Sequence, residues 1–299
     1  MTADIKKFWL VAKPGIICGN LITAAGGFFL ASGGVPKVAL LLPTILGISL
    51  VVASACVFNN FIDRRMDRKM ARTRNRVLAQ ERMSPKVALS YASLLAMAGI
   101  ALLWVETTLL SVAITLAGFM IYVGVYSLYL KRQSVYGTLV GSLAGAAPPL
   151  AAYCAVTDRI DLGALMLLTI FCLWQIPHSY AVAIFRFDEY AAAAIPVLPV
   201  KQGLKAARKH ISGYILAFTG ATLMLTFGGY TGYGYLAVAA VLGLSWFCMA
   251  CTGSRRADER RWAKQMFAFS LVNIFILSVM MSIDCTVTTI SDMLLTYAP

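Results

Sequence analysis

The chain has 299 residues, of which 60% are hydrophobic and only 13% are charged. This composition, with a mean hydropathy of +0.76, excludes an ordinary soluble domain and indicates many membrane spans. The seven cysteines are scattered, and six of them lie in or at the edge of apolar segments, so we interpret them as small core side chains rather than a redox or metal centre.

Nine apolar segments follow one another along the chain, and most are close to the ~20 residues that a helix needs to cross a bilayer. Alternating segments of about ten residues, as in a transmembrane β-barrel, are not seen in the sequence. We therefore predict an all-α integral membrane protein in which residues 1–299 form a single polytopic domain with nine transmembrane helices. The expected spans are 15–31, 39–58, 87–104, 107–130, 135–156, 162–185, 211–229, 235–251 and 266–281.

The net charge of +13 does not point to a nucleic-acid partner, because the basic residues are distributed unevenly between the loops. When nine spans are threaded with the N-terminus inside, 24 of the 26 Lys and Arg residues fall on that side, and only Lys37 and Arg159 fall on the other. This asymmetry follows the positive-inside rule. It predicts a cytoplasmic N-terminus and a C-terminus outside.

The segment after the second span, NNFIDRRMDRKMARTRNRVL, carries Asn59, Asp63 and Asp67. Their spacing of four residues places them on one side of a helix, about 6 Å apart along its axis. Carboxylate and amide oxygens placed in this way suit a hard cation such as Mg²⁺. We therefore predict that all three are metal ligands and catalytic residues. The alternative is a solvated helix with ion pairs between residues i and i+4.

Basic residues are interspersed with these acids, and a mixture of metal-binding and phosphate-binding groups suggests a bound metal–diphosphate. Lys131 and Arg132 follow the fourth span, where they are explained equally well as a topology anchor or as part of a diphosphate clamp. The candidate diphosphate-binding residues are Arg68, Lys69, Arg72, Arg76, Lys131 and Arg132.

A second long inner loop, residues 186–210, follows the sixth span, just as the loop 59–86 follows the second. It begins with the acids Asp188 and Glu189, and two acidic clusters that face each other could hold two cations around one diphosphate. The corresponding positions predict a weak internal duplication, with helix-loop units around 39–86 and 162–210.

Some polar side chains and a proline pair interrupt the apolar spans. Asn20 and Gln175 are each explained by hydrogen bonds between helices. Pro148 and Pro149 are expected to break the fifth span. Carbonyl groups freed in this way are tolerated where they line a cavity.

His178 lies within the sixth span, ten residues before Asp188 and directly after Pro177. A single buried histidine more often makes a structural hydrogen bond than binds a ligand. If the ligand is a metalloporphyrin, however, an imidazole is the usual iron donor. Both interpretations stay open from the residues alone.

The pattern NxxxDxxxD, formed by Asn59, Asp63 and Asp67, resembles the first aspartate-rich motif of the UbiA-type intramembrane prenyltransferases. The resemblance is closer to one branch of that superfamily, the protohaem IX farnesyltransferases or haem O synthases. It extends over nearly the whole chain, and WQxPH with IPVLP is typical of the branch. The stretches that carry it are KPGIICGN, NNFIDRRMDRKMARTRNRVL, YSLYLKRQSVYGTLVGSLAGAAPP and WQIPHSYAVAIFRFDEYAAAAIPVLPV.

The resemblance implies a nine-helix bundle around a central cavity in a bacterial inner membrane. Farnesyl diphosphate would bind with Mg²⁺ at a cytoplasmic cap, and its farnesyl group would pass to a vinyl group of haem B, giving haem O for terminal oxidases. A haem A synthase or a terminal-oxidase assembly is then an expected partner. The expected haem-binding residues are His178, Gln175, Trp174 and Asn20.

One departure concerns the second acidic motif. Relatives with aromatic acceptors carry spaced aspartates there, whereas this chain has adjacent Asp188 and Glu189 before Tyr190, and the sequence does not decide which acid reaches the metal. Two alternative functions are a prenyltransferase for an aromatic quinone precursor and a membrane transporter with internal repeats. The WQIPH stretch argues against the first, and the position of the charged residues at the inner membrane edge argues against the second.

Overall fold

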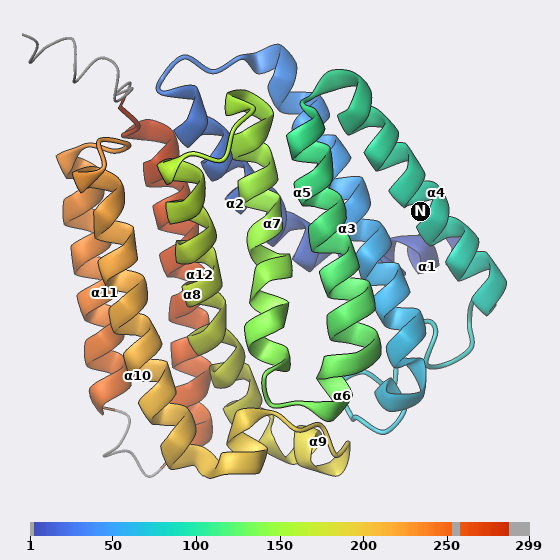
Figure 1. Ribbon diagram of the computed structural model, residues 1–299. Helices are drawn as coiled ribbons and strands as arrows, with labels where there is room; N and C mark the ends of the chain where they lie inside the picture. The colour runs from blue at the N-terminus through green and yellow to red at the C-terminus, as the bar shows by residue number, and fades with distance from the viewer. Residues whose placement is uncertain (1–2, 253–257, 287–299) are drawn as a thin grey trace, which may run out of the picture.

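The computed structural model describes residues 3–252 and 258–286. Within these ranges it contains helices and no β-strand, and nine helices are long and apolar enough to cross a membrane. They pack side by side in one bundle (Figure 1). The predicted all-α fold with nine spans is therefore confirmed. The predicted position of the C-terminus at Pro299 concerns a segment outside the described residues.

The spanning helices are α2 (Pro14–Ser32), α3 (Val38–Asp67), α4 (Pro85–Glu106), a rod made of α5 (Leu109–Met120), the π-helix η1 (Ile121–Leu130) and α6 (Lys131–Gln133), α7 (Gly137–Thr157), α8 (Leu162–Phe185), α10 (Leu198–Phe227), α11 (Tyr233–Thr252) and α12 (Glu259–Ile283). Two shorter helices, α1 (Ala3–Val11) and α9 (Phe187–Ala192), precede α2 and α10 respectively.

Several spans begin at side chains that cap a helix N-terminus. Ser84 accepts a hydrogen bond from the Val87 amide at 3.3 Å, and Thr108 accepts one from the Ser111 amide at 3.1 Å. Asp161 does the same for Ala164 at the start of α8, at 2.9 Å. Each cap satisfies a backbone donor that has no partner within its own helix. Thr108 and Asp161 follow connections of only a few residues, whereas Ser84 ends the long loop that begins after Asp67.

Three spans are longer than the hydropathy of the sequence predicts. Helix α3 continues beyond residue 58 to Asp67, and α10 begins at Leu198 rather than residue 211, with a bend at Gly203. The backbone of Gly203 (φ 84°, ψ 167°) is one that glycine adopts at little cost. Helix α12 likewise begins at Glu259. The added turns carry charged residues, so a criterion based on apolar length alone misses them.

The expected break at Pro148 and Pro149 is wrong, because α7 continues through both prolines. Each proline removes a backbone donor, so the carbonyl groups four residues earlier, on Ala144 and Gly145, lose their usual helical partner. Both of those residues line a cavity of about 550 Å³. The neighbouring helix α2 packs closely here, since a Cβ on Gly27 would lie only 2.3 Å from the Pro149 carbonyl oxygen.

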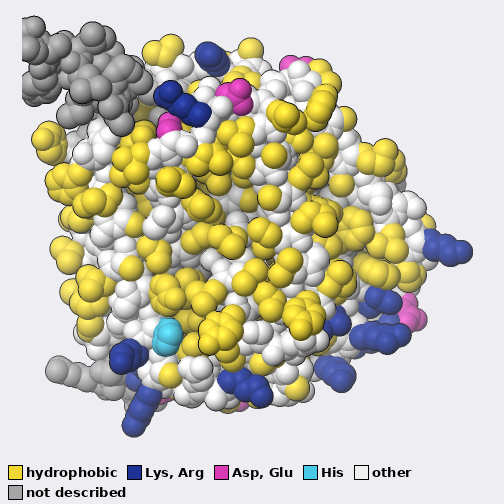
Figure 2. Space-filling model, in the orientation of Figure 1, with side chains coloured by type: hydrophobic (Ala, Val, Ile, Leu, Met, Phe, Trp, Pro, Cys, Tyr) yellow, Lys and Arg dark blue, Asp and Glu magenta, His cyan; other side chains and the backbone are white. Residues whose placement is uncertain are grey.

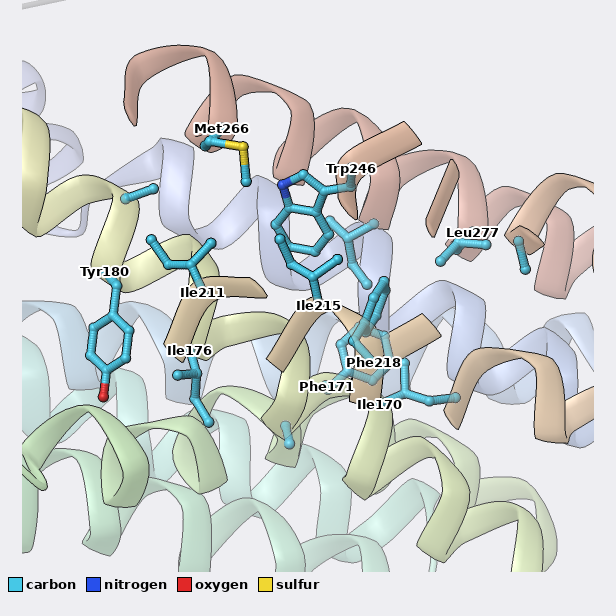
Figure 3. Packing of buried hydrophobic residues seen from close by; sticks show 14 of the residues in the cluster. Ile170, Phe171, Ile176, Tyr180, Ile211, Ile215, Phe218, Trp246, Met266 and Leu277 are labelled. Carbon is cyan, nitrogen blue, oxygen red and sulfur yellow. The ribbon is translucent and has the colours of Figure 1, made fainter. Parts of the chain in front are cut away.

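The largest buried cluster lies between α8, α10, α11 and α12 (Figure 3). Phe171 and Ile176 of α8 belong to the same cluster as Phe218 of α10, Trp246 of α11 and Met266 of α12. This apolar packing gives α8 and α12 fixed neighbours along their length. Both helices carry residues of the candidate site.

The end of the bundle that contains the last turns of α3, the loop 68–84, α6 and α9 is called the cap here (Figure 1). Hydrophobic side chains cover the middle of the face shown in Figure 2, and most of its Lys and Arg side chains gather toward the cap. The two loops predicted to be equivalent both lie at this end. Their origin by internal duplication stays a prediction.

Candidate functional site

The last turns of α3 present Asn59, Asp63 and Asp67, and all three side chains are buried. The Asn59 amide nitrogen donates to Oδ2 of Asp63 and to the hydroxyl of Ser127, each at 3.0 Å. Because the NH₂ group is used in this way, Oδ1 of Asn59 is the acceptor left for another group. The α-helical register that the spacing predicts is therefore confirmed, and it brings the motif against η1.

Each motif side chain is held by a cationic group from a different segment. Lys131 pairs with Asp63, and the guanidinium of Arg76 lies 2.9 Å and 3.1 Å from the two carboxylate oxygens of Asp67. The ammonium of Lys13 lies 2.5 Å from Oδ1 of Asn59. Acidic and basic side chains therefore alternate in a buried array rather than on a solvated helix face.

A chamber of about 190 Å³ adjoins this array. Its polar lining contains Asn59, Asp67 and Lys131 together with Arg72 and Arg76. Positive side chains with carboxylate and amide oxygens in one small chamber match what a metal-bound diphosphate needs. We call it the cap chamber.

Lys13 is a site residue that the sequence interpretation missed. It lies between α1 and α2 with a left-handed backbone (φ 57°, ψ 68°), a conformation uncommon for residues with a side chain. Burial lowers the pKa of Lys13 from its usual 10.5 to about 8, and the nearby charges of Arg76 and Lys131 add to the effect. The KPG sequence carried a readable signal, because Pro14 disfavours a helical conformation at the residue before it.

Of the six predicted diphosphate-binding residues, some line the cap chamber or lie close to the motif, and the others point elsewhere. Arg72, Arg76 and Lys131 line the cap chamber, while Arg132 lies 3.6 Å from Asp63. Arg68 and Lys69 do not line this chamber and are exposed. The side chain of Arg68 is committed elsewhere, since it donates to the Ala79 carbonyl at 2.8 Å and pairs with Glu81.

The two acids of the second cluster occupy different environments. Oε2 of Glu189 lies 3.9 Å from Nε of Arg72, and Oε1 of Glu189 accepts a hydrogen bond from Arg186 at 3.1 Å. Asp188 is exposed, whereas Tyr190 lines the cap chamber. Helix α8 ends before Arg186, so this cluster does not continue the helix of His178.

The five predicted metal ligands are therefore not all gathered at one point. Within the described residues, no three acidic, histidine or cysteine side chains form a group that could hold a metal ion. The motif on α3 supplies two carboxylates and an amide. Glu189 pairs with Arg72, which lines the cap chamber, and does not line the chamber itself. The assignment of Asp188 and Glu189 as metal ligands stays a prediction.

A larger cavity of about 550 Å³ lies deeper in the bundle, between α2, α3, α5, α7, α8 and α12. Its lining is mostly apolar and includes all four residues predicted to bind haem, namely Asn20, Trp174, Gln175 and His178. Gln175 also donates to the Ser142 carbonyl at 3.1 Å, which links α8 to α7. The sequence interpretation therefore selected four residues that share one cavity.

A third chamber of about 210 Å³ connects the two sites by shared walls. It shares His178 with the large cavity, and it shares Lys131 and Tyr190 with the cap chamber. Among the described residues, only Tyr122 of η1 lines all three spaces. Its ring stacks on that of Tyr126, with centroids 5.8 Å apart. The polar cap chamber, which suits a phosphate group, and the deeper apolar cavity thus meet at Tyr122.

The sequence matches the family model of the UbiA prenyltransferase family over residues 20–274, and the chain belongs to this family. The protoheme IX farnesyltransferase of Chromohalobacter salexigens is 61% identical over 284 residues, which cover 95% of this chain and 96% of that protein. Protoheme IX farnesyltransferase 2 of Pseudomonas fluorescens is 58% identical over 296 residues, 99% of this chain and all of that protein. The resemblance inferred from the motifs is confirmed.

Solved structures show the same fold at low sequence identity. A digeranylgeranylglyceryl phosphate synthase superposes with a TM-score of 0.76 at 14% identity, covering 94% of this chain and 99% of that one. A UbiA homologue from Archaeoglobus fulgidus bound to GPP and Mg²⁺ gives a TM-score of 0.70 at 15% identity, with 92% and 99% covered. The chain therefore has the same fold as these solved structures.

Proposed function

We propose that this chain transfers the farnesyl group of farnesyl diphosphate to a vinyl group of haem B, producing haem O. The observation that carries the proposal is the meeting of the cap chamber and the large apolar cavity at Tyr122. The first space suits a diphosphate, and the second has the size and lining for a large apolar acceptor. Relatives named protoheme IX farnesyltransferase, similar over nearly the full chain, support this choice of substrates.

Mg²⁺ is the ion that we propose for the cap chamber. The donor set fits a hard cation, because Asn59 and Asp67 line the chamber and Asp63 lies between them on the same helix face. Oδ1 of Asp63 is buried and accepts no hydrogen bond, and the Arg132 guanidinium lies 3.6 Å away, so the oxygen has a lone pair that a cation would satisfy. When bound, Mg²⁺ would neutralise negative charge that develops on the departing diphosphate.

The basic residues of the cap would stabilise the same leaving group. Arg72, Arg76 and Lys131 line the chamber and can donate hydrogen bonds to diphosphate oxygens. As the bond between C1 of the farnesyl chain and oxygen breaks, its electron pair passes to the diphosphate. Positive charge placed in advance at this point lowers the barrier.

The remaining steps take place on the deeper side of Tyr122. The π electrons of the haem vinyl group form the new bond to C1 of the farnesyl chain, and the adjacent vinyl carbon becomes positively charged. Water adds to that carbon and loses a proton, which leaves a hydroxyl group. The mostly apolar lining of the large cavity would limit early capture of the allylic cation by water.

We further propose that His178 donates to the haem iron and that Asn20, Trp174 and Gln175 contact the porphyrin. The nine apolar helices would lie in a bacterial inner membrane, with the basic cap on the cytoplasmic side, as the positive-inside rule requires. The product would then pass to a haem A synthase or to terminal-oxidase assembly.

Mass spectrometry of haem extracted from membranes with and without this protein tests the proposal. Haem carrying a hydroxyethylfarnesyl group should appear only when the protein and farnesyl diphosphate are both present. Unmodified haem together with a prenylated aromatic acid would favour a quinone-precursor acceptor instead. A membrane preparation of the Asp63→Asn variant is the matched control, since it keeps the cavity and removes a carboxylate of the cap.

A further inference from the structure

Ser270 of α12 contacts two residues of the candidate acceptor site from the opposite helix. It is fully buried, and its hydroxyl oxygen lies 2.7 Å from Nδ1 of His178. Its backbone carbonyl accepts a hydrogen bond from Nε1 of Trp174 at 2.9 Å. One residue on α12 therefore holds two side chains that α8 presents to the large cavity.

The single hydroxyl proton of Ser270 decides which nitrogen of His178 carries hydrogen. Oγ of Ser270 lies 2.6 Å from the Phe267 carbonyl oxygen and donates to it. Because that bond uses the hydroxyl hydrogen, Oγ can only accept from the imidazole, so Nδ1 of His178 must be protonated. The reverse arrangement would place Oγ and the Phe267 carbonyl oxygen 2.6 Å apart with no hydrogen between them, so that the lone pairs of two acceptors would repel each other.

Aromatic rings restrict the rotation of the same imidazole. The ring of Trp174 has its centroid 4.8 Å from that of His178, and the ring of Phe267 is at the same distance. With Nδ1 paired with Ser270, the second ring nitrogen, Nε2, is the atom left to bind a ligand. His178 lines both the large cavity and the third chamber.

We infer that Ser270 is a positioning residue, which fixes His178 in the Nδ1-protonated form so that Nε2 offers its lone pair to haem iron. A neutral imidazole whose other nitrogen donates to a fixed acceptor is the form in which histidine binds metals. The inference rests on the proposed function, since it takes haem B as the acceptor. It adds a residue outside the WQIPH stretch and assigns it a defined task.

Titration of the purified full-length protein in detergent with ferric haem B, followed by the Soret band, tests the inference. Ser270→Ala should weaken haem binding by about 10- to 100-fold, the usual cost of removing an outer-shell partner of a metal-binding histidine. Ser270→Thr keeps the hydroxyl and should restore most of the affinity. Ser278→Ala is the matched control, because Ser278 is also buried in α12 and its hydroxyl has no partner; it should bind haem as the wild type does.

Two further measurements separate positioning from a merely structural role. The reduction potential of bound haem should rise in Ser270→Ala, since the lost hydrogen bond makes the imidazole less basic and favours ferrous iron. Binding of farnesyl diphosphate with Mg²⁺ should not change. Unaltered haem affinity and potential in Ser270→Ala, with the iron signal lost in His178→Ala, would overturn the inference and leave the proposed function standing. A wild-type protein without an imidazole–iron spectrum would also overturn the inference, and the mass spectrometry of extracted haem would then decide separately whether haem B is the acceptor.

Discussion

The ammonium group of Lys13 lies 2.5 Å from the amide oxygen of Asn59. This contact joins the break between the first two helices to the helix that carries the acidic motif, across 46 residues of sequence. The other polar groups of the Asn59 amide bond to Asp63 and Ser127. The N-terminal segment is therefore part of the cap chamber and not only a membrane anchor.

Replacing Lys13 with methionine should lower kcat/KM for farnesyl diphosphate by about 10- to 100-fold, because a hydrogen bond to a charged group is worth roughly 1.5–3 kcal/mol. Lys13→Arg should retain much of the activity, since it keeps a positive charge near the same oxygens. Lys6→Met is a suitable control, because Lys6 is exposed on α1. Equal activity of the Lys13 and Lys6 variants would remove Lys13 from the site.

The lowered pKa of Lys13, about 8, predicts a pH dependence. Between pH 8 and 10.5 the unfolded chain binds more protons at this residue than the folded chain. The folded state therefore bears the cost of the buried charge below pH 8, and that cost is relieved as the pH rises to 10.5. Activity should change in the opposite sense, so kcat/KM should fall above pH 8 as the ammonium is lost. The same profile in Lys13→Arg would show that another group is responsible.

Asp63→Asn and Asp67→Asn should each reduce turnover by at least ~10², the usual cost of losing charge stabilisation at a transition state. Both carboxylates are buried, so a steady-state assay should be accompanied by a check of folding in detergent. Glu106→Gln makes the same chemical change at an exposed residue and should have no effect. Near-normal turnover of either Asp variant would remove that residue from the metal site.

Glu189→Gln should impair farnesyl diphosphate binding more than Asp188→Asn does. Glu189 lies 3.9 Å from Arg72, which lines the cap chamber, whereas Asp188 is exposed. Loss of the Glu189 charge would free Arg72 from its place beside the diphosphate site. Isothermal titration with farnesyl diphosphate and Mg²⁺ would rank the two variants, and a larger effect of Asp188→Asn would reverse this assignment.

A reporter fused after Pro299 should be active only in the periplasm, and one fused before Met1 only in the cytoplasm. The reason is that nine spans give an odd number of crossings and place most basic residues on the inner side. Cytoplasmic activity of the C-terminal fusion would show that one of the nine helices does not cross the membrane.

The membrane spans, and the position of the three motif residues on one side of α3, could be predicted because both depend on local properties of the sequence. Apolar length is read directly from the sequence, and a spacing of four residues fixes the relative position of Asn59, Asp63 and Asp67 on any α-helix. The cavity residues His178 and Gln175 came instead from the resemblance to a known branch. Periodicity alone did not separate their structural role from ligand binding.

The arrangement of the cap could not be read from the sequence, because it depends on contacts between distant segments. Seven basic residues between Arg64 and Arg76 look equivalent, yet Arg76 reaches Asp67 and Arg68 turns toward the Ala79 carbonyl. Only the folded loop distinguishes them. Lys13 escaped notice for the same reason, since its partner lies on another helix.

The number of residues in the π-helical segment η1 fixes where a basic side chain of the cap lies relative to the acidic motif. Lys131 follows this segment directly and pairs with Asp63. An α-helix turns by roughly 100° per residue and a π-helix by somewhat less, because its turn contains more residues. A deletion or insertion of one residue between 121 and 130 would therefore rotate Lys131 by close to a quarter of a turn, away from Asp63. Many membrane helices tolerate such changes by tilting. Here a single-residue indel, several turns from the reacting atoms, would act as an active-site mutation.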